Sequence, residues 1–222
     1  MRNRSWNGWL RWRESALIGN DIVDLADPQA VGKHRDVRFM DRVFTPDERR
    51  TILSSDAPDT ILWSLWAAKE TGYKAMGKLH PALSSAPKRY PVRLSGAPFP
   101  EAGIVETPCG PISLRFDITG EYVHCIGATA DEDLDAVVWN VHEIPHPDIS
   151  SERQSDFLRN MTRETLSRCL NESPESIEIV RQKGHRGLGP PEVYFGGKRT
   201  AIDISMSHDG RFAACAISVH HG

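Results

Sequence analysis

Short runs in which apolar residues dominate or alternate with polar ones predict most of the β-structure of this chain. Each run is bounded by Gly, Pro, Asp or Ser residues, which is typical of strands that end in turns. A turn at Gly120 divides the longest central run into two strands. The predicted strands lie in segments 16–25, 112–128, 136–144, 177–181, 192–195 and 201–219.

Two longer segments, 61–76 and 150–170, predict helices, and Gly77 is placed to end the first of them. A third helix is predicted within 39–53. There Thr45 is a natural N-cap, Pro46 suits the first helical position and Glu48 completes a capping box.

The segment 78–111, rich in Pro, Ser and Gly, predicts a loop or a hairpin between the first long helix and the next strands. The order is therefore strand, helix and strands, followed by strand, helix and strands again. Such an order calls for a search for an internal repeat.

The chain aligns with itself at an offset of about 90 residues. Segment 112–125 lies over 202–215 without a gap, so that the turn glycines Gly120 and Gly210 coincide, as do the apolar positions. Two further matches occur in the same order: 69–74 over 163–168, at an offset of 94, and more weakly 18–25 over 137–144, at an offset of 119.

We therefore predict an α+β fold made of two tandem repeats related by a pseudo-twofold axis. The expected boundaries are an N-terminal extension over 1–15, a first repeat over 16–130 and a second repeat over 131–222, which starts at the acidic linker 131–135.

Composition excludes several classes of protein. The 222 residues carry a net charge of −3, so no global field favours nucleic acid, and no apolar run approaches the roughly 20 residues that cross a bilayer. Segment 1–13 combines Arg residues with three Trp residues and has no apolar core of the secretory type. We expect a packed or frayed extension there, with a helix lying on a partner or membrane surface as the alternative.

The cysteines and histidines add no metal signature. The four cysteines form no C-x-x-C pair, so we expect a reduced, cytoplasmic protein with structural thiols. The pairs His142 with His146 and His220 with His221 have spacings that metal sites use, but such pairs are usually incidental.

The first long helix contains the pattern K-E-x-x-x-K, formed by Lys69, Glu70 and Lys74. Residues i and i+4 share a helix face, so Glu70 and Lys74 can act together on a magnesium–phosphate ligand. The alternative is an ordinary ion pair on the surface.

A second candidate residue is Asp21, which lies in an apolar strand where an unpartnered carboxylate is costly. Its counterpart in the second repeat is Asn140, whereas His208 of the second repeat has Ile118 as its counterpart. We therefore expect each half to supply part of one site. Asp24 lies three residues after Asp21, which directs it to the opposite strand face, and we leave it out of the metal site.

Four segments together resemble the signatures of the 4′-phosphopantetheinyl transferase superfamily. The motifs are G-x-D-I-x-x-D-L, R-x-F-T-x-x-E, W-A-x-K-E-x-x-x-K-A-x-G and I-S-x-S-H-D-x-x-F-A, found in 18–25, 42–48, 66–77 and 204–213. Their order is similar to that of the holo-[acyl-carrier-protein] synthases, while the length resembles the larger two-half members, in which the Ser-His motif comes first.

The resemblance implies Mg²⁺-dependent transfer of the 4′-phosphopantetheine group of coenzyme A to a serine of an apo carrier protein, with release of adenosine 3′,5′-bisphosphate. It implies Asp21 and Glu70 as metal ligands and Glu70, Lys74 and His208 as catalytic residues. The serine proton could pass to Glu70 or to a metal-bound water. The residues expected to contact coenzyme A are Lys74, Ser207, His208, Lys183 and Arg186.

The expected partner is an acyl or peptidyl carrier protein of fatty-acid, polyketide or nonribosomal peptide synthesis. Carrier proteins are acidic near the modified serine, so basic residues should face them; the candidates are Lys33, Arg35, Arg38 and Arg42. A solvated basic loop is the alternative. Two repeats can complete one site within one chain, so we expect a monomer, with a homo-oligomer as the alternative.

Two other functions remain open from the sequence. One is a catalytically degenerate module that binds coenzyme A or a carrier protein. The other is an interaction protein held at a membrane by segment 1–13.

Overall fold

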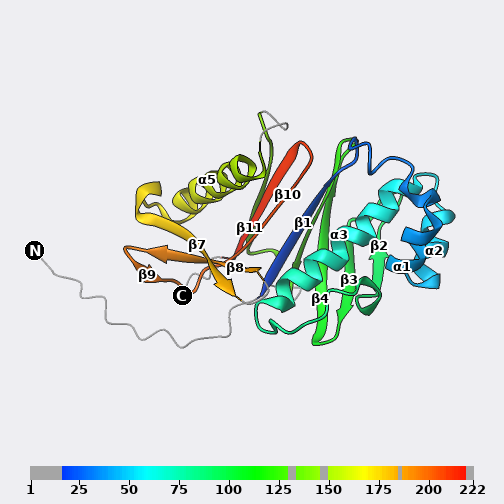
Figure 1. Ribbon diagram of the computed structural model, residues 1–222, viewed down its shortest axis with the longest axis horizontal. Coiled ribbons are helices and arrows are strands. Elements are labelled where there is room, and N and C mark those ends of the chain that lie inside the picture. The colour runs from blue at the N-terminus through cyan, green and yellow to red at the C-terminus, as the bar shows by residue number, and fades with distance from the viewer. Residues whose placement is uncertain (1–16, 130–133, 146–149, 185–186, 219–222) are drawn as a thin grey trace, which may run out of the picture.

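The structure is a computed structural model that describes residues 17–129, 134–145, 150–184 and 187–218 (Figure 1). It is a mixed α+β fold with antiparallel sheets, as the sequence predicts. The expected N-terminal extension and most of the acidic linker lie outside the described residues. Within the described residues, no helix is long and apolar enough to cross a membrane.

The larger sheet has five antiparallel strands in the order β1-β5-β4-β3-β2. The strands predicted for 16–25 and 112–128 are confirmed, and the segment 78–111 contributes a hairpin to the same sheet. The strands are β1 (Ile18–Asp24), β2 (Val92–Ser95), β3 (Ala102–Thr107), β4 (Gly110–Ile118) and β5 (Tyr122–Ala128).

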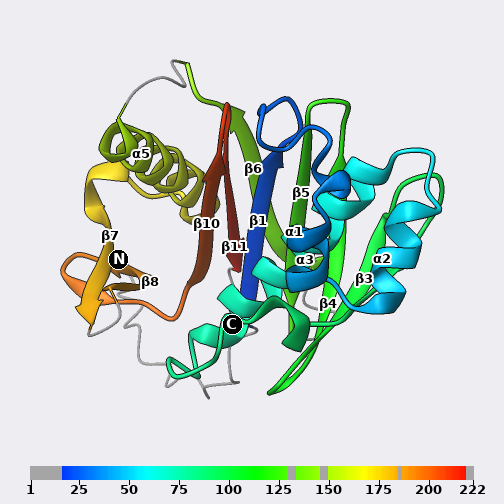
Figure 2. The ribbon, with the colours of Figure 1, turned by 45° about the vertical axis from the view of Figure 1, so that its right-hand side comes forward.

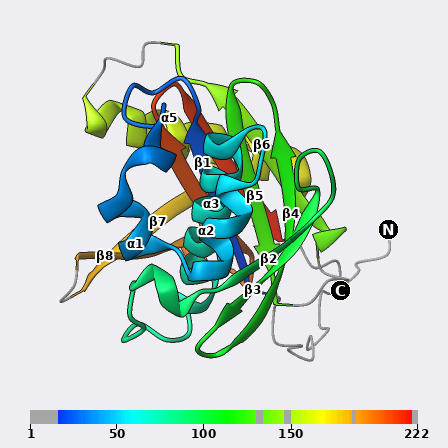
Figure 3. The ribbon, with the colours of Figure 1, turned by 90° about the vertical axis from the view of Figure 1, so that its right-hand side faces the viewer.

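One face of this sheet is covered by α3 (Pro58–Gly77), with α1 (Val37–Val43) and α2 (Pro46–Leu53) beyond it (Figure 3). Short 3₁₀ turns at Lys33–Arg35 and Pro87–Arg89 connect these elements to the rest of the half. The main apolar core fills the space between α3 and the sheet.

Local signals set the helix ends. The predicted capping box is confirmed, because the Thr45 side chain accepts a hydrogen bond from the Glu48 N–H and the Glu48 carboxylate accepts one from the Thr45 N–H. Helix α3 ends at Gly77 as expected but begins at Pro58, three residues before the predicted start at 61. Proline is favourable in a first turn, where its missing N–H is not needed.

The second half holds a three-stranded sheet with the order β10-β11-β6, covered by α5 (Ser151–Leu170), and a separate hairpin sheet (Figure 2). The predicted strands and helix are confirmed here, and the hairpin strands extend further toward their turn than predicted. The strands are β6 (Val137–Glu143), β7 (Ile177–Gly184), β8 (Gly187–Phe195), β9 (Lys198–Arg199), β10 (Asp203–Asp209) and β11 (Phe212–Ser218); a 3₁₀ turn spans Pro174–Ser176.

The strands β1-β5-β4 and β6-β11-β10 follow the same order and the same register. In β4 and β5, Ser113 lies opposite Ala128, and in β10 and β11, Asp203 lies opposite Ser218, with each partner 90 residues later in the chain. At the other edge, Asp24 lies opposite Tyr122, and Glu143 lies opposite Phe212.

The halves meet where β1 and β10 run side by side (Figures 1 and 2). Three N–H groups on the edge of β1 donate hydrogen bonds to side chains of β10. Each donor and its acceptor are 185 residues apart in sequence, so the two strands run parallel. The bonds, each 2.9 Å long, join Ile18 to Asp203, Asn20 to Ser205 and Asp24 to Asp209. We call this junction the seam.

A difference between the halves leaves β10 available for the seam. In the first half, the hairpin strand β3 pairs with β4 and extends the sheet. In the second half, β7, β8 and β9 form a sheet of their own, so the edge of β10 is not taken by a hairpin strand. The edge of β10 faces β1 instead.

Candidate functional site

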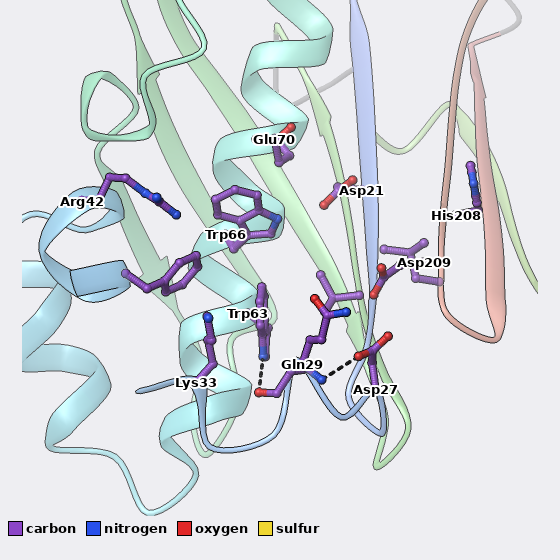
Figure 4. A pocket seen from close by; sticks show the side chains of 14 residues that line it. Asp21, Asp27, Gln29, Lys33, Arg42, Trp63, Trp66, Glu70, His208 and Asp209 are labelled. Carbon is purple, nitrogen blue, oxygen red and sulfur yellow. Dashed lines mark hydrogen bonds between the residues drawn. The ribbon is translucent and has the colours of Figure 1, made fainter. Parts of the chain in front are cut away.

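A cavity of about 500 Å³ opens at the seam, between β1, α1, α3 and the end of β10 (Figure 4). One side, the carboxylate wall, is formed by Asp21, Glu70 and Asp209, with His208 beside them. The opposite side, the α1 wall, is formed by Lys33, Phe39 and Arg42. The indole rings of Trp63 and Trp66 on α3 lie between the two walls.

The geometry of the site depends on a close approach between α3 and β1. A Cβ atom at Gly19 would lie 2.1 Å from the carbonyl oxygen of Thr71, so only glycine fits there. Glu70 directly precedes Thr71 in α3, and Lys74 follows it one helical turn later. Asp21 follows Gly19 by two residues in β1, so the close contact holds Glu70 and Lys74 next to Asp21. This contact explains the glycine of the G-x-D motif.

Asp21 lies on the face of β1 toward α3 and is 8% exposed. Its carboxylate accepts a hydrogen bond of 2.7 Å from Lys74 Nζ, which also donates to the backbone oxygen of Asn20 at 3.1 Å. Burial raises the pKa of Asp21 although the charge of Lys74 opposes the shift. The ammonium group of Lys74 therefore lies near two carboxylates, because Glu70 lies beside Asp21.

Burial and the negative charge of Asp21 raise the pKa of Glu70 to about 7. The buried carboxylate of Asp21 and the half-buried one of Glu70 repel each other, and a hard cation would relieve this repulsion, so the donor set fits Mg²⁺. Among the described residues, no group of three or more His, Cys, Asp or Glu side chains could hold a metal. Asp21 and Glu70, the two ligands expected from the sequence, lie next to each other here and could hold such a cation.

The alternative of a surface ion pair between Glu70 and Lys74 is wrong. Lys74 forms its ion pair with Asp21, which is 53 residues away in sequence, and Glu70 is half-buried. The helical spacing placed Glu70 and Lys74 on one face correctly, but β1 supplies the partner of Lys74.

His208 comes to the cavity from the second half, on β10. Burial lowers the pKa of its imidazole, and the positive charge of Lys74 lowers it further. A neutral imidazole can donate one hydrogen bond and accept another. The structure thus brings together Asp21, Glu70 and His208 from three separate elements.

Ser207 and Asp24 lie away from the cavity. Ser207 points to the face of β10 opposite to His208, where its hydroxyl is buried and has no hydrogen-bond partner within the described part of the chain. Asp24 is held at the end of the seam by Arg211, whose Nε and Nη2 each donate a 2.9 Å hydrogen bond to its carboxylate. The exclusion of Asp24 from the metal site is consistent with this position.

A second cavity, of about 650 Å³, lies on the other side of Lys74, between α3 and the β7–β8 hairpin. Apolar groups such as Tyr73, Pro190 and Met206 line most of it, and Lys183 also lines it. Of the two hairpin residues expected from the sequence to contact coenzyme A, Lys183 lines this cavity, and Arg186 lies outside the described residues.

The four basic residues expected to face a carrier protein do not all lie at the cavity. Lys33 and Arg42 line the first cavity and lie 4.8 and 5.9 Å from the ring centre of Phe39. Arg35 and Arg38 are exposed and do not line it. Three further lining residues, Phe39, Trp63 and Asp209, were not predicted from the sequence. The spacing of the two tryptophans, three residues apart on α3, is a sequence signal for an aromatic wall.

Comparison with known proteins supports the resemblance seen in the motifs. Residues 17–126 match the family model of the 4′-phosphopantetheinyl transferase superfamily. The chain is 42% identical over 60 residues to a holo-[acyl-carrier-protein] synthase of Protochlamydia amoebophila (strain UWE25). That stretch is 27% of this chain and 49% of the relative, so the chain spans about half the length of the curated relative that it matches. The family resemblance is confirmed.

Proposed function

Because residues 17–126 belong to the 4′-phosphopantetheinyl transferase superfamily, we propose that this protein transfers 4′-phosphopantetheine from coenzyme A to a serine of an apo carrier protein. Adenosine 3′,5′-bisphosphate would be the second product. The observation that carries the proposal is the convergence of Asp21, Glu70 and His208 on one cavity, with Lys74 bound to Asp21.

Asp21 and Glu70 would hold a Mg²⁺ ion. When bound, the ion supplies charge neutralisation for the pyrophosphate oxygens of coenzyme A. The protein supplies the fixed positions: Asp21 from β1 and Glu70 from α3, held together by the contact at Gly19.

The reaction joins the serine oxygen of the carrier to the β-phosphorus and breaks the bond from that phosphorus to the bridging oxygen. Lys74, freed from its ion pair with Asp21, meets the departing phosphate as a point charge. Glu70, whose carboxylate lies in the same cavity, takes the serine proton as general base. His208 donates its ring N–H to a phosphate oxygen.

Coenzyme A would lie along the seam. The second cavity, which Lys183 lines, receives the adenosine end of coenzyme A, and Arg186, three residues later in the sequence, would also contact it. The first cavity then receives the acceptor serine. Lys33 and Arg42 on the α1 wall carry the positive charge that an acidic carrier surface requires.

The two halves would be tandem copies, over 16–130 and 131–222, of which the first keeps the metal ligands and the second supplies His208. The shared strand order and register support this proposal. One seam within one chain completes the site, which favours a monomer of the holo-[acyl-carrier-protein] synthase type.

The proposal is tested by incubating the protein with coenzyme A, Mg²⁺ and apo carrier proteins from fatty-acid, polyketide and peptide synthesis, and reading intact mass. We expect one carrier to gain a single phosphopantetheine. Asp21→Asn and Glu70→Gln should abolish the gain. The matched control is Glu164→Gln, the counterpart of Glu70 on the exposed face of α5, which should keep it.

A folded wild-type protein that modifies no carrier would contradict the proposal. Binding of coenzyme A without transfer, measured by calorimetry, would then identify the chain as a degenerate binding module.

A further inference from the structure

Two motif residues have no part in the proposed reaction. Glu48 closes the R-x-F-T-x-x-E motif, and Lys69 directly precedes Glu70 in the K-E-x-x-x-K pattern. In the structure they form one ion pair, with Lys69 Nζ at 2.7 and 3.0 Å from the two carboxylate oxygens of Glu48. The side chains of Lys69 and Glu48 are only 1% and 3% exposed.

The pair fixes three chain segments by directional bonds. Glu48 accepts hydrogen bonds from the N–H of Thr45 at the start of α2 (2.7 Å) and from the N–H of Val92 at the start of β2 (2.9 Å). Lys69 of α3 donates to two backbone oxygens of the segment before β2, at 2.8 and 3.3 Å. Helices α2 and α3 and strand β2 are therefore locked in one arrangement.

A contribution to stability does not explain why this buried contact is an ion pair and not an apolar one. Removing two charges from water costs several kcal/mol for each ion, and well-packed apolar replacements of buried pairs are often as stable or more stable. What an ion pair adds over an apolar contact is direction. An apolar pair would allow α2 to slide or rotate on α3.

The arrangement that the pair fixes includes the α1 wall of the first cavity. Lys69 Nζ lies 5.8 Å from the ring centre of Phe44, the residue that joins α1 to α2. Phe44 packs edge-on against Phe39 at 6.0 Å, and Phe39 contacts Trp66 at 5.9 Å. These contacts connect the ion pair to Phe39, the ring that Lys33 and Arg42 of the α1 wall both contact.

We propose that the Glu48–Lys69 pair is a positioning element that sets the α1 wall relative to Glu70, and thereby the placement of the carrier protein in the cavity. This inference rests on the proposed function. Coenzyme A would lie mainly against the seam and the second cavity, so the pair should affect recognition of the carrier and leave recognition of coenzyme A unchanged.

The test is the double variant Glu48→Gln/Lys69→Met, which keeps the shapes of both side chains and removes both charges. Transfer is measured with varied carrier at saturating coenzyme A, and then with varied coenzyme A at saturating carrier. We expect the KM for the carrier to rise about 10-fold, which corresponds to about 1.4 kcal/mol. The kcat and the KM for coenzyme A should stay within about twofold of wild type, a split that a loss of folded protein would not produce.

The matched control is Asp47→Asn/Arg50→Met, which removes an exposed ion pair from the same helix, where the side chains of Arg50 and Asp47 are 76% and 82% exposed. It should leave all three constants unchanged. If the double variant fails to fold, Phe44→Leu breaks the contact between the ion pair and the α1 wall and should give the same selective rise.

The outcomes separate the two proposals. A wild-type protein that modifies no carrier contradicts the proposed function. An active wild type with an unchanged carrier KM in a folded double variant, or in Phe44→Leu, overturns the positioning role. A fall in kcat alone overturns it as well.

Discussion

Lys78 at the end of α3 donates hydrogen bonds of 2.7 and 2.8 Å to the two carboxylate oxygens of Asp203 on β10, and so joins the two halves of the chain. The same ammonium group donates to the backbone oxygens of Ile18 and Ile204 at 2.7 and 2.9 Å, one on each side of the seam. At the other end of the seam, Arg211 binds Asp24. The halves are thus fixed at both ends, with the candidate site between them.

The first prediction concerns this junction. Lys78→Met leaves the carboxylate of Asp203, whose side chain is only 15% exposed, without its cation and should lower the free energy of unfolding by about 3 kcal/mol. Urea denaturation followed by circular dichroism measures the loss. Lys88→Met, at an exposed lysine of the same half, is the control and should change stability little. Equal effects of the two variants would show that the pair does not join the halves.

The second prediction concerns the contact between β1 and α3. Gly19→Ala places a Cβ atom against the carbonyl of Thr71 and must move α3 away from β1. We expect a loss of about 2 kcal/mol of stability and, because a shift of about 1 Å misplaces Glu70, a fall in transfer of about 100-fold. Gly120→Ala, where the added atom meets nothing within 4 Å, is the control. Wild-type transfer by Gly19→Ala would contradict the prediction.

The third prediction follows from Glu70. Its folded-state pKa of about 7 lies above the ordinary 4.5, so wild type should lose stability as the pH rises from about 4.5 to 7. Glu70→Gln removes this loss and should be more stable than wild type by about 2 kcal/mol at pH 8 without metal. Urea unfolding at pH 5 and pH 8 in the presence of a chelator measures the difference. If both proteins show the same pH dependence, the pKa of Glu70 is not raised.

The fourth prediction follows from His124, which lies on the face of β5 away from α3. Its Nε2 accepts a 3.3 Å hydrogen bond from the side-chain amide nitrogen of Asn20, and its ring packs on Trp139 across the interface between the halves. Burial lowers the pKa of His124 to about 3, with Lys74 contributing to the shift. Stability from this neutral imidazole is complete above pH 6.5 and is lost as the pH falls toward 3.

Replacing His124 should therefore flatten the acid limb of the stability curve. Wild type should lose up to about 1.4 kcal/mol more per pH unit between pH 6 and 4 than His124→Gln does. Chemical unfolding at several pH values measures the slopes, and His80→Gln, at an exposed histidine, should keep the wild-type slope. Parallel curves for wild type and His124→Gln would place the acid sensitivity elsewhere.

Helix caps and helix ends that depend on only a few neighbouring residues could be predicted from the sequence. The Thr45–Glu48 capping box and the end of α3 at Gly77 need only neighbouring residues, and both were predicted. Helix α1 was not separated from α2 in the prediction, because its cap is a single bond from the Phe39 N–H to Asp36 and its pattern covers only seven residues.

The partners of the site residues were not readable in the same way. Helical spacing correctly put Glu70 and Lys74 on one face, but Lys74 pairs with Asp21 from β1. Lys69 stands next to Glu70 in sequence, yet its partner Glu48 lies 21 residues away on another helix. Pattern indicates which residues share a face, whereas a charge partner depends on which elements pack together.

The sequence by itself determined the order of the two long helices and of most strands, the family motifs and the candidate residues Asp21, Glu70 and His208, because side-chain periodicity and motif spacing are local properties. Only the tertiary structure decided that β10 lies against β1. That neighbour follows from the β7–β8 hairpin, which forms its own sheet and leaves the β10 edge open. Edge pairing is a competition between segments far apart in the chain, and its outcome depends on the packing of the whole fold.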